Sequence, residues 1–318
     1  MRVLFMGTPD FAVPSLVALI LGGYKIAGVV TQPDKPKGRG RKLAQPPVKE
    51  IAQIYGLDVF QPENIRDTNF IEILRRMDLD IIIVVAYGKL IPPGILGIPK
   101  KGCINVHASL LPQYRGAAPI HRAIINGETK TGISIMCLSQ CIDAGDVIRQ
   151  APIEIHKEDN VGVIHDHLAE MGAKLLLETL SGIKDNSVKY TPQDDSRATY
   201  APVLTRKDEM ISWERSTEDI LNQIRGLDPW PGAFTSLNSK NLKIWSAKKK
   251  ENQNSDNARP GCVLESDKSE LLIKTGDGVI SVVELQLQGL RRMDAADFLR
   301  GRPITPGTVL GAFIEKRE

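Results

Sequence analysis

The sequence predicts an α/β protein in which a doubly wound, Rossmann-like parallel-sheet domain is followed by a small, β-rich barrel domain. Three observations support this fold class. Short apolar runs alternate with amphipathic stretches in the first half of the chain, a polar, proline-containing stretch then interrupts this pattern, and short β-like runs separated by turn residues follow it. The length of 318 residues also suits two cores better than one.

The first domain is predicted over residues 1–188. Runs that are apolar on both faces are typical of buried parallel strands, and four of them occur, at 3–5, 26–30, 81–85 and 104–106. Between and after them the pattern predicts helices at 13–21, 48–55, 70–77 and 161–180, and two further strands at 133–138 and 147–155. This alternation of strand and helix predicts the doubly wound domain.

A linker is predicted at residues 189–206, where the chain is polar and has no sustained apolar period. The second domain is predicted over 207–318. It opens with a helix pattern at 217–227, and its β-like runs fall at 242–245, 271–274, 279–287 and 308–314.

Composition excludes several classes of protein. The formal net charge of +3 permits an anionic partner without requiring one. The four cysteines form no C-x-x-C pair and have no histidine at zinc-ligand spacing, so we expect no metal and a reducing, cytoplasmic location. The apolar runs are too short for a signal peptide or a membrane span, so we expect no membrane partner.

Polar residues at one strand end suggest carbonyl chemistry. Open α/β sheets bind ligands at the carboxyl ends of their strands, and Asn105 and His107 come at the end of the 104–106 run, on one face of the strand. An amide can donate to a developing oxyanion, and an imidazole can move a proton near neutral pH. Asp143, directly after another predicted strand, could orient that imidazole, or it could be an ordinary turn residue.

A dinucleotide site is disfavoured, because the first strand end at residues 7–11 lacks the G-x-G-x-x-G pattern. The segments around the candidate residues instead resemble the folate-dependent formyltransferase family. The resemblance is carried by NVHASLLP at 105–112, RGAAP at 115–119, DAGD at 143–146, FMGTPDF at 5–11 and TQPD at 31–34.

The resemblance implies that Asn105, His107 and Asp143 act together in moving a formyl group from 10-formyltetrahydrofolate to an amine. It implies no metal and no nucleotide cofactor. It further implies a folate pocket bordered by five residues: Ser109, Leu110, Leu111, Pro112 and Tyr87. Three positions depart from the family pattern, namely Cys141, Ile142 and His121, and they leave the local packing open.

A basic segment at residues 33–49 indicates which formyl acceptor the protein uses. It is longer than the roughly 2–6 residues of an ordinary strand-to-helix connection, and it contains Arg39, Arg41 and Lys42. Taken alone it could be a solvated loop or an arm that orders against phosphate. The resemblance favours the arm, because family members that formylate methionyl-tRNA carry a basic insertion here that engages the acceptor stem.

The C-terminal half resembles the same branch of the family through YAPVL at 200–204, NQIRGL at 222–227 and PWPGAF at 229–234. The resemblance therefore implies transfer to the α-amino group of initiator methionyl-tRNA for translation initiation, with an OB-like β-barrel as the second domain that contacts the tRNA. No obligatory protein partner is evident from the sequence, so we expect none. Two alternatives remain: a formyltransferase acting on an amino-sugar nucleotide, in which the basic arm has no obvious use, and a catalytically silent tRNA-binding module.

Overall fold

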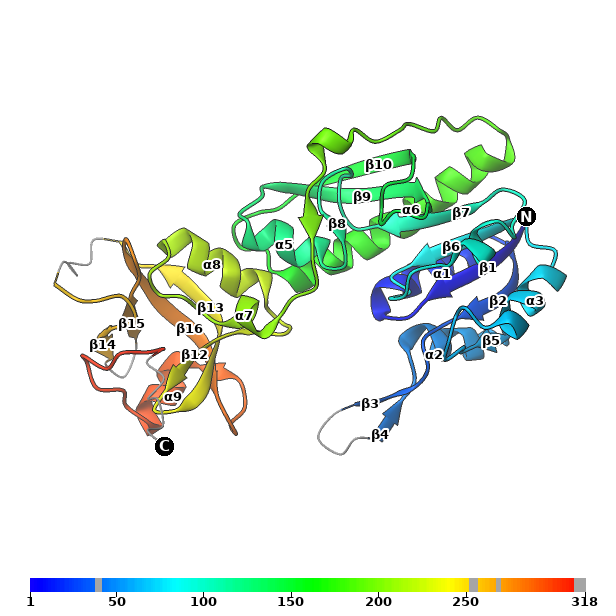
Figure 1. The fold of residues 1–318 in the computed structure, drawn as a ribbon. Coiled ribbons are helices and arrows are strands. Elements are labelled where there is room, and N and C mark those ends of the chain that lie inside the picture. Colours follow the sequence, from blue (N-terminus) through cyan, green and yellow to red (C-terminus); the bar gives the residue numbers. More distant parts are fainter. Residues whose placement is uncertain (38–41, 252–256, 267–269, 312–318) are drawn as a thin grey trace. The chain divides into compact units, whose positions relative to one another are not determined.

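A computed structural model describes residues 1–37, 42–251, 257–266 and 270–311, and the chain divides into two compact units (Figure 1). Unit 1 comprises Met1–Pro119, Lys130–Glu154 and His165–Pro202, and unit 2 comprises Ile120–Thr129, Ile155–Ile164 and Val203–Glu318. The division falls at the start of helix α5 (Pro119–Ile125) and inside helix α6 (Val161–Lys184). Two short segments of the first half of the chain therefore belong to the second unit.

Unit 1 is built on a seven-stranded sheet with the order β10-β9-β7-β6-β1-β2-β5. The strands are β1 (Arg2–Gly7), β2 (Lys25–Val30), β5 (Val59–Phe60), β6 (Ile81–Val85), β7 (Cys103–His107), β9 (Lys130–Cys137) and β10 (Val147–Glu154). Neighbours from β7 to β5 are parallel, whereas β9 runs antiparallel to both β7 and β10. The predicted Rossmann-like fold is confirmed, with an antiparallel pair added at one side of the sheet.

Burial explains this sheet. β6 consists of five β-branched residues, all of them buried, which suits a strand covered on both faces. Exposed and covered residues alternate toward the end of β10, as expected of an edge strand with one wet face. Besides α6, the helices of unit 1 are α1 (Val13–Leu21), α2 (Pro47–Ile54), α3 (Thr68–Arg76) and α4 (Pro93–Leu96), together with the 3-10 turns η1 (Asp10–Ala12) and η2 (Asp195–Arg197). The helices predicted at 13–21, 48–55 and 70–77 are thus confirmed to within about two residues at each end.

The basic segment contains a small hairpin. Strands β3 (Lys35–Lys37) and β4 (Lys42–Ala44) pair antiparallel and lead directly into α2. Figure 1 shows this hairpin extending from the region of β2 and α2 in unit 1. The segment is therefore neither a short connection nor an unstructured loop in its described part.

Unit 2 is built on an antiparallel sheet with the order β12-β13-β16-β15-β14, and β17 pairs with β16. The strands are β12 (Ala233–Leu237), β13 (Lys240–Lys249), β14 (Val263–Ser266), β15 (Leu271–Lys274), β16 (Val279–Leu287) and β17 (Met293–Asp294). The helices are α7 (Arg206–Glu209), α8 (Thr217–Gly226) and α9 (Ala295–Gly301), together with α5 from Ile120 onward. The predicted β-rich second fold is confirmed. The predicted strand at 308–314 is wrong in its described part, because Val309 makes only an isolated bridge to Cys262 there.

An ion pair between Arg122 of α5 and Asp208 of α7 links two parts of unit 2, with 2.7 Å between the guanidinium and carboxylate. The hydrogen bond from Arg122 lowers the pKa of Asp208 from its ordinary 3.8 to about 2. A carboxylate with a depressed folded-state pKa stabilises the protein fully above its unfolded pKa, and this contribution is lost as the pH falls through the folded value.

We therefore expect Asp208→Asn to lower the unfolding free energy near pH 5 and to flatten its decline between about pH 4 and pH 2. Urea unfolding followed by tryptophan fluorescence reports this unit, because all three tryptophans (Trp213, Trp230 and Trp245) belong to it. Glu209→Gln is the control, since Glu209 forms a separate ion pair with the exposed Arg206. Parallel pH curves for Asp208→Asn and the unsubstituted protein would show that the pair does not act in this way.

Candidate active site

Asn105 and His107 project from the carboxyl-terminal part of β7, where β7 lies between β6 and β9. Their spacing of two places both on one face of the strand. His107 is buried, with 5% of its surface exposed, whereas Asn105 is partly exposed. The Asn105 amide makes no hydrogen bond to any residue in the described ranges, so its donor groups are available to a substrate.

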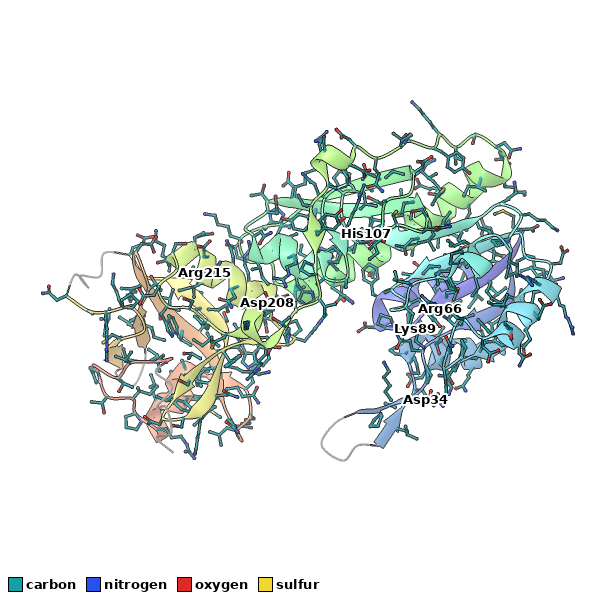
Figure 2. All side chains as sticks on the ribbon, viewed as in Figure 1. Asp34, Arg66, Lys89, His107, Asp208 and Arg215 are labelled. Carbon is teal, nitrogen blue, oxygen red and sulfur yellow. The ribbon has the colours of Figure 1, made fainter. Side chains whose placement is uncertain are left out.

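The contacts of His107 determine which ring nitrogen carries chemistry. Nε2 lies 3.0 Å from the carbonyl oxygen of Tyr114, and a carbonyl only accepts, so Nε2 is the protonated donor in the neutral ring. Nδ1 therefore carries the lone pair, and it lies 3.7 Å from Oδ2 of Asp143. The imidazole presents a basic nitrogen beside a carboxylate (His107 is labelled in Figure 2).

Asp143 reaches this position from the loop after β9. Its φ of 48° lies in the left-handed region, which aspartate adopts more readily than most L-residues when local hydrogen-bond contacts hold it there. One such contact is the backbone N–H of Gly116, which donates to Oδ2 of Asp143 over 2.9 Å. The structure thus brings together Asp143, from the loop after β9, and His107, from the end of strand β7.

Ser134 of β9 holds residues 109–112, the segment predicted to line the folate pocket, through hydrogen bonds to its main chain. The Ser134 hydroxyl donates to the carbonyl of Ser109 over 2.6 Å and accepts from the N–H of Leu111 over 3.0 Å. Gln150 of β10 donates to both Ser134 and the carbonyl of Leu111. Ser109 and Leu111 are buried, whereas Leu110 and Pro112 are partly exposed. Of the four predicted side chains, these last two can therefore touch a ligand without rearrangement.

The Tyr87 side chain is too deeply buried to contact the folate directly. Its side chain is 1% exposed and packs in the apolar cluster that contains Phe70 and Leu74, and this burial raises its pKa to about 12. Its carbonyl accepts hydrogen bonds from Thr8 and Gln32, both at 3.0 Å. Only the backbone of Tyr87 faces the strand-end loops, so a folate contact there stays a prediction about main-chain atoms.

The basic hairpin is held at its base by a polar network. Lys49 of α2 donates to both carboxylate oxygens of Asp34 and to Gln61, and Gln61 donates to Asp34 and to the carbonyl of Gln32. Hydrogen bonds from Lys49 and then Gln61 lower the pKa of Asp34. Figure 2 places Asp34 at the root of the hairpin. The network fixes where the hairpin starts.

Of the residues predicted to bind tRNA, Arg39 and Arg41 lie outside the described residues, and Lys42 is described only as the first backbone position of β4. The three departures from the family pattern lie within the described residues. Cys141 is exposed and Ile142 is 52% exposed, so neither disturbs a packed region. His121 stacks edge-on against Trp230 within unit 2.

Arg115 and Gln193 adjoin the candidate site, although no sequence pattern predicts a role for either. Arg115 is 3% exposed, and its guanidinium donates to Oε1 of Gln193, which lies in the stretch predicted as a linker. The burial of Arg115 is the feature that points to this arrangement, and a sequence does not show that a single arginine is buried.

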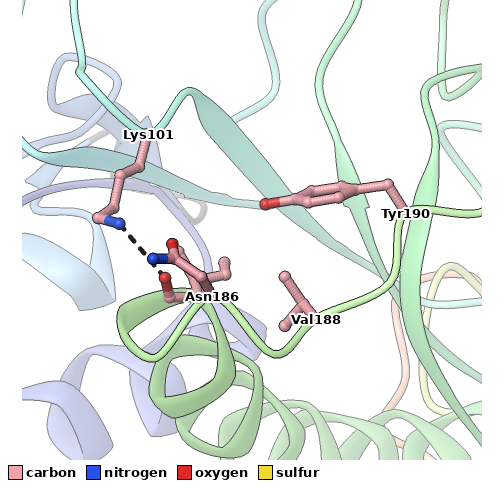
Figure 3. A pocket seen from close by; sticks show the side chains of 5 residues that line it. Lys101, Asn186, Val188 and Tyr190 are labelled. Carbon is pink, nitrogen blue, oxygen red and sulfur yellow. Dashed lines mark hydrogen bonds between the residues drawn. The ribbon is translucent and has the colours of Figure 1, made fainter.

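Other kinds of site find little support in the described part of the chain. No group of three histidine, cysteine or acidic side chains within these ranges could hold a metal ion. None of the helices described is long and apolar enough to cross a membrane. The small pocket in Figure 3 is lined by Lys101, Ile183, Asn186, Val188 and Tyr190. Lys101 precedes β7, whereas His107 ends it, so this pocket lies toward the amino end of β7 and the candidate site lies at its carboxyl end.

Known proteins match the chain over nearly its whole length. The family model described as formyl transferase matches residues 1–180, and the model described as formyl transferase, C-terminal domain, matches residues 203–303. A methionyl-tRNA formyltransferase of Pelotomaculum thermopropionicum is 52% identical over 311 residues, covering 98% of this chain and 99% of that protein. One from Bacillus subtilis is 48% identical over 316 residues, covering 99% of both.

Among solved structures, HypX from Aquifex aeolicus in complex with tetrahydrofolic acid aligns with a TM-score of 0.65 at 19% identity. The alignment covers 94% of this chain and 47% of HypX, so the chain spans about half the length of that protein. At this identity the likeness concerns the fold alone.

Proposed function

The chain belongs to the methionyl-tRNA formyltransferase family, and from this premise we propose that Asn105, His107 and Asp143 carry the transfer of a formyl group from 10-formyltetrahydrofolate to the α-amino group of initiator methionyl-tRNA. The products are N-formylmethionyl-tRNA and tetrahydrofolate. The observation that supports this most is the placement of Nδ1 of His107 3.7 Å from Oδ2 of Asp143, beside an Asn105 amide with open donors. We place the reaction in the cytoplasm, where translation starts.

The reaction forms one C–N bond and breaks another. The substrate amine attacks the formyl carbon, and the carbonyl oxygen gains negative charge that the Asn105 N–H₂ stabilises by hydrogen bonding. One such donor is worth about 3 kcal/mol in a transition state. The bond from carbon to N10 of the folate then breaks, and the formyl group stays on the amine.

A proton must move in the same step, because the attacking amine loses one and the departing N10 gains one. Nδ1 of His107 holds the lone pair that can take this proton, since Nε2 already donates to the Tyr114 carbonyl. The imidazolium that forms is stabilised by the adjacent Asp143 carboxylate. A positioned acid/base of this kind contributes about 10²–10⁴ in rate.

A single assay tests the proposed function and its alternatives. The protein is incubated with 10-formyltetrahydrofolate and either charged initiator tRNA or an amino-sugar nucleotide, and the formylated product is identified by mass. Formyl-methionine with the first acceptor alone supports the proposal. Product with the sugar alone supports the sugar enzyme. Binding of tRNA without product supports the silent module.

We also propose that the hairpin β3–β4 engages tRNA phosphates. Replacing Arg39, Arg41 and Lys42 with alanine should raise the KM for methionyl-tRNA and reduce the slope of log K against log salt by about one for each phosphate that is no longer neutralised. The KM for the folate should stay unchanged, because the proposed folate segment lies at 109–112.

The charge-matched control replaces three exposed cations elsewhere in unit 1, namely Arg75, Arg76 and Lys174. If both triple variants change the salt dependence equally, the effect reflects net charge and the hairpin has no special role. If neither changes it, the hairpin does not contact RNA.

A further inference from the structure

Residues 191–201 form the central part of the stretch predicted as a linker. They hydrogen-bond to the loop after β7 and to the loop after β9, which adjoin the candidate site. Thr191 bridges to Val147 at the start of β10. Further along, strand β11 (Tyr200–Ala201) pairs in parallel with β8 (Arg115–Gly116), a pairing extended by hydrogen bonds between Thr199 and the loop around residue 114. The segment therefore fixes Gly116, whose N–H binds the Asp143 carboxylate.

Gln193 sits in the middle of this segment and uses both ends of its amide. Nε2 donates to the carbonyl oxygens of Asp143 over 2.8 Å and Gly145 over 2.7 Å. Oε1 accepts from Nε of Arg115 over 3.1 Å and from a terminal nitrogen of the same guanidinium over 2.9 Å. Both amide hydrogens and the oxygen are thus satisfied.

Arg115 decides which way the Gln193 amide points. A guanidinium has donors only, so it must face the amide oxygen, and the N–H₂ group must then face the two carbonyls. Arg115 is itself 3% exposed and also donates to Asp195 over 2.7 Å, and Asp195 has an 80% exposed side chain. A buried charge with these partners is a rigid support for Gln193.

The loop that Gln193 contacts needs support. Asp143 adopts a left-handed φ of 48°. Gly145 approaches the carbonyl oxygen of Cys137 so closely that a Cβ there would lie 2.0 Å from it. The Gln193 hydrogen bonds are made to these two residues, and they hold the main chain from which the Asp143 carboxylate reaches His107.

We propose that Gln193, oriented by Arg115, is a positioning residue for formyl transfer that keeps the Asp143 carboxylate beside His107. The inference rests on the proposed function and assigns to the predicted linker a part in the chemistry. The Gln193 amide is fully used by Arg115 and by the carbonyls of Asp143 and Gly145, so we expect its replacement to change the reacting geometry and to leave substrate binding largely unchanged.

Gln193→Glu tests this with the least change in shape. The carboxylate keeps its contact with Arg115 but replaces the N–H₂ donor with an oxygen that repels the carbonyls of Asp143 and Gly145. We expect kcat to fall about 10- to 100-fold, the loss that a displacement of roughly 1 Å can cause, with both KM values within about two-fold of the unsubstituted protein. Gln193→Met, which removes donor and acceptor without adding charge, should lower kcat in the same way if the glutamate variant fails to fold.

Asp194→Asn is the matched control, because this exposed neighbour of Gln193 accepts hydrogen bonds from Ser196 and makes no hydrogen bond to Arg115 or to the Gln193 amide among the described residues; its kcat should equal that of the unsubstituted protein. In an Asp143→Asn background, Gln193→Glu or Gln193→Met should cause almost no further loss, since both changes remove one function. An undiminished kcat in the folded single variants, or an equal fractional loss in both backgrounds, overturns the proposal. Failure of the unsubstituted protein to formylate methionyl-tRNA in the same assay overturns the proposed function instead.

Discussion

His107→Ala is expected to lower kcat by about 10²–10⁴ while the protein still folds and binds folate. The substitution removes the nitrogen in the proposed site that can take the amine proton and return it to N10. His107 is 5% exposed and belongs to the end of β7, so truncation leaves a small void and a moderate loss of stability. Steady-state kinetics and thermal unfolding, measured on the same preparation, separate the two effects.

His107→Gln distinguishes proton transfer from simple packing. Glutamine fills much of the same volume and can donate to the Tyr114 carbonyl as Nε2 does, but it cannot carry a proton at neutral pH. It should be about as inactive as the alanine variant and more stable. Near-normal turnover in His107→Gln would show that the imidazole only fills space.

Asn105→Ala is expected to lower kcat by about 10²–10³, the usual loss when one oxyanion donor is removed. The KM for 10-formyltetrahydrofolate should change little, because the donor matters most when the carbonyl oxygen carries charge. The Asn105 amide has no partner among the described residues, so its removal leaves no protein group unsatisfied and should hardly change the unfolding free energy.

Asn105→Asp is the isosteric companion. It keeps the shape of the side chain and places negative charge where the oxyanion forms, so its kcat should be at least as low as that of Asn105→Ala. A variant that bound the folate poorly but turned over normally at saturation would assign Asn105 to ground-state binding, and the oxyanion role would then be wrong.

Much of the fold could be predicted because its signals are local. The five consecutive β-branched residues of β6 and the apolar runs of β1 and β2 indicate buried strands without any knowledge of their partners. Likewise the amphipathic stretch at 161–180 predicts most of α6. Each of these elements has an apolar pattern that can be recognised from its own residues alone.

The features that the sequence patterns did not predict depend on contacts with distant parts of the chain. The direction of β9 relative to β7 depends on the connection through α5, and no residue within β9 encodes it. The β-like run at 308–314 has strand-forming residues, but its described part makes only one bridge. Strand propensity describes a residue that fits a pleated surface, and it does not show that a neighbouring strand is present.

The candidate site divides along the same line. The strand-end position predicted Asn105 and His107, but only the resemblance predicted that Asp143 joins them, because β9 runs antiparallel to β7 and its carboxyl end lies at the amino end of β7. The depth of Tyr87 in the core and the hydrogen bonds of Gln193 depend on residues far away in the sequence. A stretch that is polar and rich in aspartate has the composition of a linker whether or not another loop binds it.

The pairing of β11 with β8 decides where this polypeptide can be cut. A truncation at residue 188, or a chimaera joined there to another C-terminal half, would delete or replace the residues that order the loop around Asp143. A junction after Pro202, where unit 1 ends, retains them. For anyone exchanging C-terminal halves between relatives, the junction that keeps the Asp143 loop intact lies some fourteen residues beyond residue 188, and the incoming half must still pack against 120–129 and 155–164, which belong to unit 2.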